Sequence, residues 1–113
     1  LFIAGDKFLL AQAIDNLIQN AIDFSANNGV INIAVTSNHQ TEIIIHDHGS
    51  GIPSYALEKI FDRFYSLARP HSQKKSSGLG LCFVKQIAEL HNGAITIKNG
   101  NDSGVIACLT LNS

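Results

Sequence analysis

Two asparagines, Asn16 and Asn20, stand four residues apart in a segment with helical periodicity, so their side chains share one face of that helix. The simplest explanation is a solvated polar stripe that also includes Asp23 and Asn27. Asparagine is, however, a poor helix former in mid-helix, and its amide oxygen is a suitable ligand for a hard cation such as Mg²⁺. The pair is therefore a candidate cation site, and an ordinary solvated helix face is the alternative.

The segment DHGSGI, residues 47–52, places a carboxylate, Asp47, at the end of an expected strand, followed by Gly49 and Gly51. Such a carboxylate can accept a hydrogen bond from an exocyclic amine, and glycines let a flat ring approach the backbone closely. An ordinary turn that ends a strand has the same letters. On its own this pattern is weakly specific.

Two further segments have features suited to phosphate binding. In IFDRFYSL, residues 60–67, Arg63 could reach a phosphate, although the neighbouring aromatics equally suit packing on the core. In SSGLGLCFV, residues 76–84, Gly78 and Gly80 open an expected helix, where free backbone N–H groups form an anion site. Lys74 and Lys75 add positive charge just upstream, but the doubled glycine could also serve close packing.

The elements that must position these residues follow from hydrophobic periodicity and turn signals. A long helix begins after the expected N-cap Asp6 and ends at Asn27, Asn28 and Gly29. The other expected elements are a strand at 2–4, a hairpin of 30–37 and 41–49, a short helix at 55–61, a helix at 78–93 closed by Asn92 and Gly93, and a hairpin of 94–99 and 104–112.

Residues 62–77 have no clear period and are expected to be a long mobile loop. The predicted fold is a two-layer α/β sandwich. Its sheet is mixed but mostly antiparallel, and about three helices cover one face.

Composition limits the classes of function. A chain of 113 residues, 45% apolar and 15% charged, indicates one globular domain. The net charge of −1 and the lack of a basic stripe argue against nucleic acid, and no apolar run reaches the roughly 20 residues of a membrane span. The chain does not begin with methionine, so we expect a piece of a longer protein. Cys82 and Cys108 are expected to be buried thiols, and the HDH segment lacks a third metal ligand.

The order and types of the four motifs resemble the N, G1, F and G2 boxes of the ATP-binding catalytic domain of sensor histidine kinases, within the GHKL superfamily of gyrase, Hsp90 and MutL. The matching segments are DNLIQNAIDFS, DHGSGI, FDRFY and SSGLGLCFVKQIAELHNG. The resemblance covers essentially the whole chain and implies the Bergerat fold. The phrase FDRFYSLARP…KKSSGLGL is also similar to the CreC-type, carbon-source-responsive branch.

This resemblance implies a role for each motif residue, with ATP and Mg²⁺ as cofactors. Asn20 corresponds to the Mg²⁺ ligand, Asn16 supports the phosphate side, Asp47 binds the adenine amino group, and Asn16, Asn20 and Arg63 form the catalytic set. Residues 63–77 correspond to the ATP lid. The full binding set consists of Asn16, Asn20, Asp47, Gly49, Gly51, Ile52, Phe61, Lys74, Lys75, Ser77, Gly78, Leu79, Gly80 and Leu81.

Two positions depart from the family pattern. Ser76 stands where the G2 box usually has one more glycine, and Asp23 stands where many N boxes have Lys or Arg. A carboxylate at 23 would repel phosphates unless it faces away, so charge neutralisation would depend on Mg²⁺, Arg63 and Lys74 or Lys75.

The N box also separates kinase from ATPase. Hydrolysing relatives have a glutamate general base at the position of Asn16, which cannot accept a proton at neutral pH. The resemblance therefore implies transfer of the γ-phosphoryl group to a histidine on a separate dimerisation domain, absent from this chain, with a response regulator downstream. It implies a monomeric fragment and a cytoplasmic domain of a parent anchored in the bacterial inner membrane. The alternatives are a degenerate GHKL scaffold that binds no nucleotide, or a GHKL ATPase.

Overall fold

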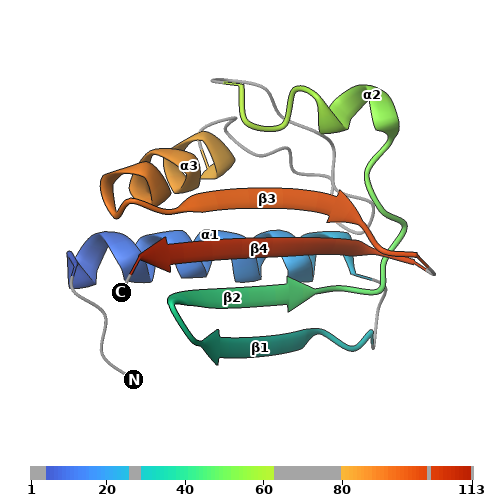
Figure 1. The fold of residues 1–113 in the computed structure, drawn as a ribbon. Coiled ribbons are helices and arrows are strands. Elements are labelled where there is room, and N and C mark those ends of the chain that lie inside the picture. Colours follow the sequence, from blue (N-terminus) through green and yellow to red (C-terminus); the bar gives the residue numbers. More distant parts are fainter. Residues whose placement is uncertain (1–4, 26–28, 63–79, 102, 113) are drawn as a thin grey trace.

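The computed structural model describes residues 5–25, 29–62, 80–101 and 103–112, which form a sheet with helices on one face (Figure 1). The predicted strand at 2–4 and the loop at 63–77 lie outside these residues. The helices and strands are α1 (Lys7–Phe24), β1 (Asn32–Ser37), β2 (Gln40–His46), α2 (Ser54–Leu57), α3 (Gly80–Leu90), β3 (Ala94–Asn99) and β4 (Val105–Asn112).

The four described strands lie in the order β1-β2-β4-β3. The two predicted hairpins are confirmed, since β1 pairs with β2 and β3 pairs with β4. The hairpins join through β2 and β4, where Ile45 lies opposite Ala107. Every pairing among the described strands is antiparallel, so this part of the sheet is not mixed as predicted.

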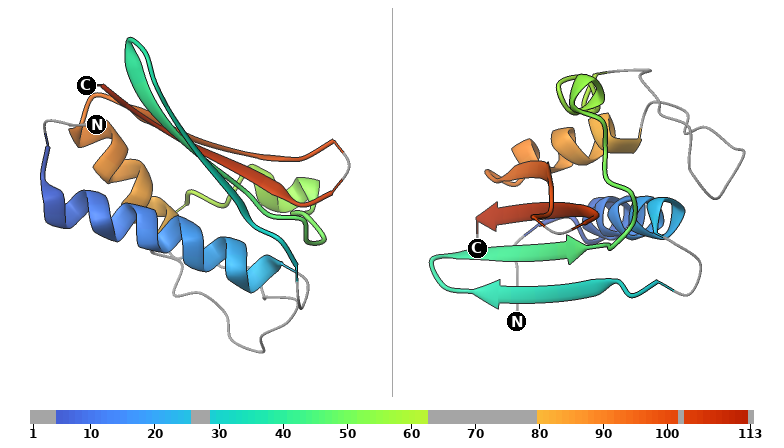
Figure 2. Two further views of the ribbon diagram at one scale, coloured as in Figure 1. Left: turned by 90° about the horizontal axis from the view of Figure 1, so that it is seen from below. Right: turned by 90° about the vertical axis from the view of Figure 1, so that its right-hand side faces the viewer.

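The core lies between the sheet and the pair α1 and α3, which contact each other on the same face, while none of the described helices covers the other face (Figure 2). Alternate residues of β2 and β4 point into it, as the period of two requires. Leu17, Ile87 and Leu109 are almost fully buried there. This arrangement confirms the predicted two-layer sandwich. No helix among the described residues is long and apolar enough to cross a membrane.

Helix α1 begins as predicted and ends earlier. The Asp6 carboxylate accepts the Leu9 N–H at 3.0 Å, which caps the first turn. The helix stops at Phe24 because Ser25 takes an extended conformation, with its N–H donating to the Ala21 carbonyl oxygen. The prediction that residues 27–29 end this helix is therefore wrong, and Asn27 and Asn28 themselves lie outside the described residues.

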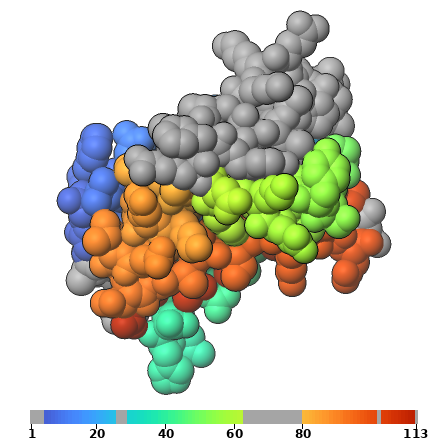
Figure 3. Space-filling view, turned by 90° about the horizontal axis from the view of Figure 1, so that it is seen from above, coloured from blue at the N-terminus to red at the C-terminus, as the bar shows by residue number. Residues whose placement is uncertain are grey.

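Helix α2 is shorter than the predicted 55–61 segment. After Leu57 the chain continues in tight turns, with the Lys59 N–H bonded to the Ala56 carbonyl and the Asp62 N–H to the Lys59 carbonyl. Ala56 nevertheless packs in a second apolar cluster with Ile52, Ile60 and Val105. Figure 3 shows this segment beside α3 on the top surface.

The end of α3 follows the prediction. Asn92 has a φ of 56° and occupies the left-handed region. The Gly93 N–H donates to the Ala88 carbonyl oxygen and the Asn92 N–H to that of Glu89, which is the Schellman arrangement. The predicted start at Gly78 lies outside the described residues.

His91 joins the two long helices. Its Nε2 accepts the Asp6 N–H at 3.0 Å, while its Nδ1 lies 2.7 Å from the Ile87 carbonyl oxygen. The tautomer with its proton on Nδ1 satisfies both contacts. The ring therefore ties the end of α3 to the start of α1, in line with a structural role for this histidine.

We predict that His91→Ala lowers the free energy of unfolding by about 1–3 kcal/mol, because it removes both contacts and leaves the Asp6 N–H without its acceptor. Chemical denaturation measures the change. Gln86→Ala, on the exposed side of the same helix, is the control and should shift stability by less than about 0.5 kcal/mol. Equal stability of the His91→Ala variant and the parent chain would contradict the proposed link.

Candidate functional site

Asp47 directly follows β2 and continues its alternation, so its side chain points toward the helices, and it is only 3% exposed. Its Oδ1 accepts the Gly49 N–H at 2.9 Å and the Val105 N–H at 3.3 Å. Its own N–H donates to the Val105 carbonyl oxygen at 3.0 Å. Backbone groups thus fix a buried carboxylate at the edge of the core, and both bonds to the side chain end on the same oxygen.

Gly49 brings the 47–52 loop against the end of α1. A Cβ at this position would overlap the carbonyl oxygen of Phe24 and come within 3.2 Å of the Ser25 Cα. Close backbone approach therefore requires glycine here. As a result, Asp47 is held next to the helix that carries Asn16 and Asn20.

Hydrogen bonds to Asn99 also fix the far end of the 47–52 loop, at Ile52. Gly51 has a φ of 83°, which other residues adopt only with strain. The Ile52 N–H donates to Asn99 Oδ1 at 2.8 Å, and Asn99 Nδ2 donates to the Ile52 carbonyl oxygen at 2.8 Å. Asn99 is absent from the predicted set, because an asparagine before a glycine reads as a turn residue and its partner lies 47 positions away.

Asn16 and Asn20 are half-buried on α1, beside the core residues Ala13, Leu17 and Ala21. Asn16 lies at the first turn of α3, since its Oδ1 would be 3.5 Å from a Cβ at Gly80. From Asn16 to Phe24 the helix rises about 12 Å, with Asn20 midway. The two amides therefore lie along a line from the start of α3 to the 47–52 loop.

Steric overlap explains glycine at position 49, but it does not explain glycine at position 80. Among the described residues, a Cβ at Gly80 would meet the Asn16 side chain alone, at 3.5 and 3.9 Å, which are ordinary contact distances. Packing among the described residues therefore does not demand glycine at this position. Close approach by a ligand, the other explanation that the sequence offers for this glycine, is compatible with this geometry.

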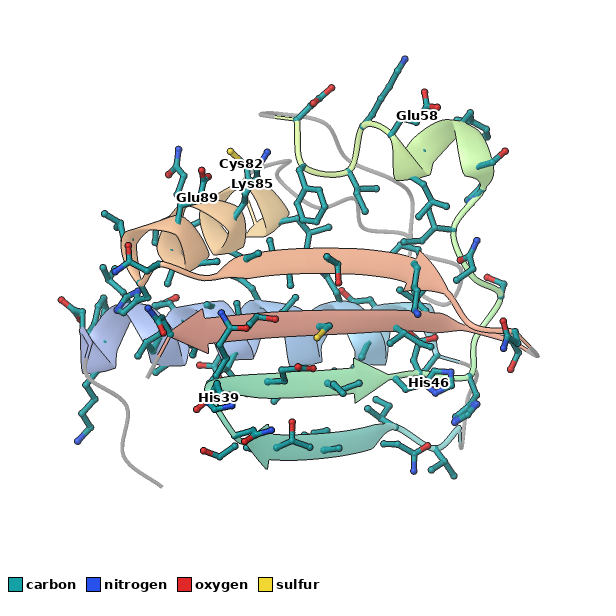
Figure 4. All side chains as sticks on the ribbon, viewed as in Figure 1. His39, His46, Glu58, Cys82, Lys85 and Glu89 are labelled. Atoms are coloured by element: carbon teal, nitrogen blue, oxygen red, sulfur yellow. The ribbon has the colours of Figure 1, made fainter. Side chains whose placement is uncertain are left out.

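Phe61 and Leu81 each pack against both apolar clusters, so they connect the segment after α2 to the first turn of α3. Lys85 Nζ lies 6.0 Å from the centroid of the Phe61 ring. Figure 4 shows Lys85 and Cys82 on the upper side of α3, away from β3. The packing role expected for the aromatic Phe61 is thus present in the structure.

The remaining predicted residues lie outside the described part of the chain. They are Arg63, Lys74, Lys75, Ser77, Gly78 and Leu79, together with the rest of the segment assigned as a lid. Asp23, the departure from the family pattern, accepts a hydrogen bond from Gln19 Nε2 at 2.9 Å along the surface of α1.

The other reactive residue types have structural partners. The rings of His46 and His48 lie 4.4 Å apart, and His48 Nε2 contacts Asn32 Oδ1 at 2.8 Å. No cluster of three metal-ligating side chains occurs among the described residues. Cys108 and Cys82 are half-buried free thiols, and burial raises the pKa of the Cys108 thiol, which favours its unreactive protonated form.

The geometry suits a ligand with two chemically different ends. At one end, a buried carboxylate and a glycine-containing loop can accept an amine on a flat ring. At the other, two amide oxygens and the start of α3 suit an anion accompanied by a hard cation. The roughly 12 Å of helix α1 between Asn16 and Phe24 sets the separation of these ends.

Comparison with known proteins finds relatives that match almost the whole chain. The sequence model of the family described as histidine kinase-, DNA gyrase B-, and HSP90-like ATPase matches residues 5–113. The chain is 50% identical over 111 residues to the sensor protein CreC of Escherichia coli (strain K12), a match that covers 96% of this chain and 23% of CreC. It therefore spans less than a quarter of that relative, and the predicted CreC-type resemblance is confirmed.

Solved structures show the same fold. The mycobacterial sensor histidine kinase MprB superposes with a TM-score of 0.84 at 30% identity, over 96% of this chain and 75% of that chain. The nucleotide-free catalytic domain of the histidine kinase ThkA gives a TM-score of 0.82 at 28% identity, over 97% of this chain and 70% of that chain.

We predict very different stability effects for the same substitution at two glycines. Gly49→Ala should destabilise the fold by about 3 kcal/mol or more, because the new methyl group meets backbone that cannot move cheaply. Gly80→Ala should stay within about 1 kcal/mol of the parent chain, since there is room and alanine favours the helix. Thermal and chemical unfolding measure both. A Gly80→Ala loss as large as that of Gly49→Ala would restore the packing explanation.

Proposed function

Because this chain belongs to the family of histidine kinase-, DNA gyrase B-, and HSP90-like ATPases, we propose that it is the ATP-binding catalytic domain of a two-component sensor histidine kinase. The whole of residues 1–113 is assigned to this single domain. The observation that carries the proposal is the buried Asp47 carboxylate, held by backbone N–H groups through one oxygen at the end of β2.

Asp47 binds the adenine end of the nucleotide. Since the Gly49 and Val105 N–H groups both donate to Oδ1, we assign Oδ2 to the exocyclic amino group of adenine. A carboxylate is a strong acceptor for such a donor in a site from which water is excluded. Gly49, Gly51 and Ile52 form the backbone against which the ring lies.

Asn20 and Asn16 serve the phosphate end. Asn20 is assigned as the Mg²⁺ ligand, and Asn16 supports the phosphates next to the first turn of α3. The residues present fit such a group, because amide oxygens suit Mg²⁺ and Gly80 places no side chain beside Asn16. When bound, Mg²⁺ would neutralise negative charge on the triphosphate.

The start of α3, at Gly80 and Leu81, is assigned to bind the phosphates through backbone N–H groups, and Ser77, Gly78 and Leu79 are assigned to the same role. Arg63, Lys74 and Lys75 are assigned as the cations of an ATP lid at 63–77. These assignments follow the family motif.

Asn16 favours phosphoryl transfer over hydrolysis. Its amide cannot accept a proton from water, whereas a neutral histidine acceptor already has a lone pair and needs little help from a base. What this chain contributes is positioning and charge neutralisation, which are the main requirements of phosphoryl transfer.

The acceptor histidine is assigned to a separate dimerisation domain of the parent protein. His91 is unsuitable, because both ring nitrogens make contacts in the fold. A response regulator would receive the phosphoryl group next, and the parent would be anchored in the bacterial inner membrane with this domain in the cytoplasm. CreC is itself named a sensor protein, which supports these assignments.

Asp47→Asn and Asn20→Ala should each weaken Mg·ATP binding at least about tenfold, which corresponds to roughly 1.4 kcal/mol. Asp47→Asn keeps an oxygen for the two backbone donors, so the fold should survive while the amine contact is lost. Asn20→Ala should also remove the gain in affinity on adding Mg²⁺. Titration with a fluorescent ATP analogue, with and without Mg²⁺, measures both effects.

The controls are Asp15→Asn and Asn38→Ala, which change exposed residues of the same types. Both should bind Mg·ATP as tightly as the unsubstituted chain. Gly80→Ala should weaken binding while the fold remains stable. If the parent chain binds no nucleotide at millimolar concentration, the scaffold interpretation holds. Folded Asp47 and Asn20 variants with unchanged affinity would contradict the assigned sites.

This chain alone should bind Mg·ATP without phosphorylating itself, because the acceptor histidine is on another domain. Incubation with γ-labelled ATP should leave it unlabelled, whereas adding the parent's dimerisation domain should produce an acid-labile phosphoryl group on that domain. The control replaces the acceptor histidine of the added domain with glutamine. Stoichiometric acid-labile label on this chain by itself would refute the prediction.

A further inference from the structure

The 47–52 loop is fixed at both ends by one pair of facing residues. Asp47 exchanges hydrogen bonds with the backbone of Val105, and Ile52 exchanges two with the Asn99 side chain. Asn99 and Val105 are direct partners in the β3–β4 register. In Figure 1 the end of β3 lies beside the chain that leaves β2. A single position in the hairpin therefore sets both where the loop begins and where it ends.

The Asn99 carboxamide is chemically suited to this role. It offers one acceptor and two donors in one plane, so it pairs with both the N–H and the C=O of Ile52, each at 2.8 Å. A serine hydroxyl can donate and accept, but only through one oxygen on a shorter side chain, so it cannot place a donor and an acceptor side by side as the amide does; an ionised aspartate could not donate to the carbonyl. The fit is close, since a Cβ at Gly51 would lie 3.0 Å from Asn99 Oδ1.

The contact acts on the backbone that surrounds the base. Ile52 is buried in the second apolar cluster, and Gly51 before it has a φ of 83°. Without the Asn99 bonds, the partly buried N–H and C=O of Ile52 lose these partners, and the loop can relax away from its left-handed turn. The position of the Asp47 carboxylate relative to the loop backbone would then no longer be fixed.

We propose that Asn99 is a positioning residue that holds the 47–52 loop in register with Asp47 and thereby gives the site its preference for a purine carrying an exocyclic amine. The inference depends on the proposed nucleotide site. It assigns a role in base recognition to a strand-end residue outside the four motifs. Asn99 acts through Ile52 and Gly51 and is not assigned a contact with the nucleotide.

The test compares Asn99→Ala with Asn101→Ala, an exposed asparagine in the same β3–β4 turn. Three ligands are titrated with Mg²⁺: ATP, inosine triphosphate, which lacks the amine, and inorganic tripolyphosphate, which lacks the base. Asn99→Ala should weaken ATP binding about tenfold, inosine triphosphate much less, and tripolyphosphate not measurably. Asn101→Ala should match the parent for all three.

Hydrogen exchange of the Ile52 amide provides an independent readout without nucleotide. The exchange should be faster in Asn99→Ala and close to the parent in Asn101→Ala. If Asn99→Ala does not fold, Asn99→Ser retains part of the pairing and should still prefer ATP over inosine triphosphate less strongly than the unsubstituted chain does.

Two results would overturn the proposal. One is an unchanged ATP affinity in a folded Asn99 variant, and the other is an equal loss for ATP, inosine triphosphate and tripolyphosphate, which a purely structural role would give. If the unsubstituted chain binds no ATP, the proposed nucleotide site is wrong. If that chain binds ATP and a folded Asn99 variant binds it equally well, the nucleotide site stands and only the role of Asn99 is wrong.

Discussion

The Asp47 carboxylate is buried at the end of a central strand, and a buried charge is costly unless hydrogen bonds compensate for it. The surrounding structure meets this requirement with backbone groups. Val105 and Gly49 donate to Oδ1, and Gly49 can do so because its lack of a side chain lets the loop lie against Phe24. The strand order β1-β2-β4-β3 brings Val105 next to Asp47. The position of the Asp47 carboxylate thus depends on the strand order, on glycine at position 49 and on the end of α1.

Helix α1 connects this group to the rest of the site. The face with Ala13 and Leu17 is buried against the sheet, which fixes the rotation of the helix, and Asn16 and Asn20 lie half-buried on its flank. The contact of Gly49 with Phe24 fixes its position along the axis at one end. A shift of the helix would move the amides relative to the carboxylate. Core packing and ligand geometry are therefore set by the same helix. Substitutions in the core should change the positions of the Asn16 and Asn20 amides relative to the Asp47 carboxylate.

Local patterns of the sequence were enough to predict the helices, both hairpins, the Asp6 cap and the left-handed Asn92, because each depends on residues within one turn or hairpin. The end of α1 was predicted too late, since Ser25 leaves the helix to meet the 47–52 loop, a tertiary requirement. Asn99 and the link from His91 to Asp6 could not be found this way, because their partners lie 47 and 85 positions away. Motif residues that must contact a ligand have recognisable spacing, whereas residues that hold the motifs in place have none.

The two glycines at positions 49 and 80 show how ligand and packing constraints can be separated. Overlap with the Phe24 carbonyl accounts fully for glycine at position 49, so its presence says little by itself about a ligand. At position 80 the described residues leave room for a side chain, and helix stability would favour one. Gly80 weakens the helix, and packing among the described residues does not require it, so a constraint from a ligand is compatible with its position. Backbone N–H groups at a helix start attract anions, so the position is consistent with phosphates that meet bare backbone beside Asn16.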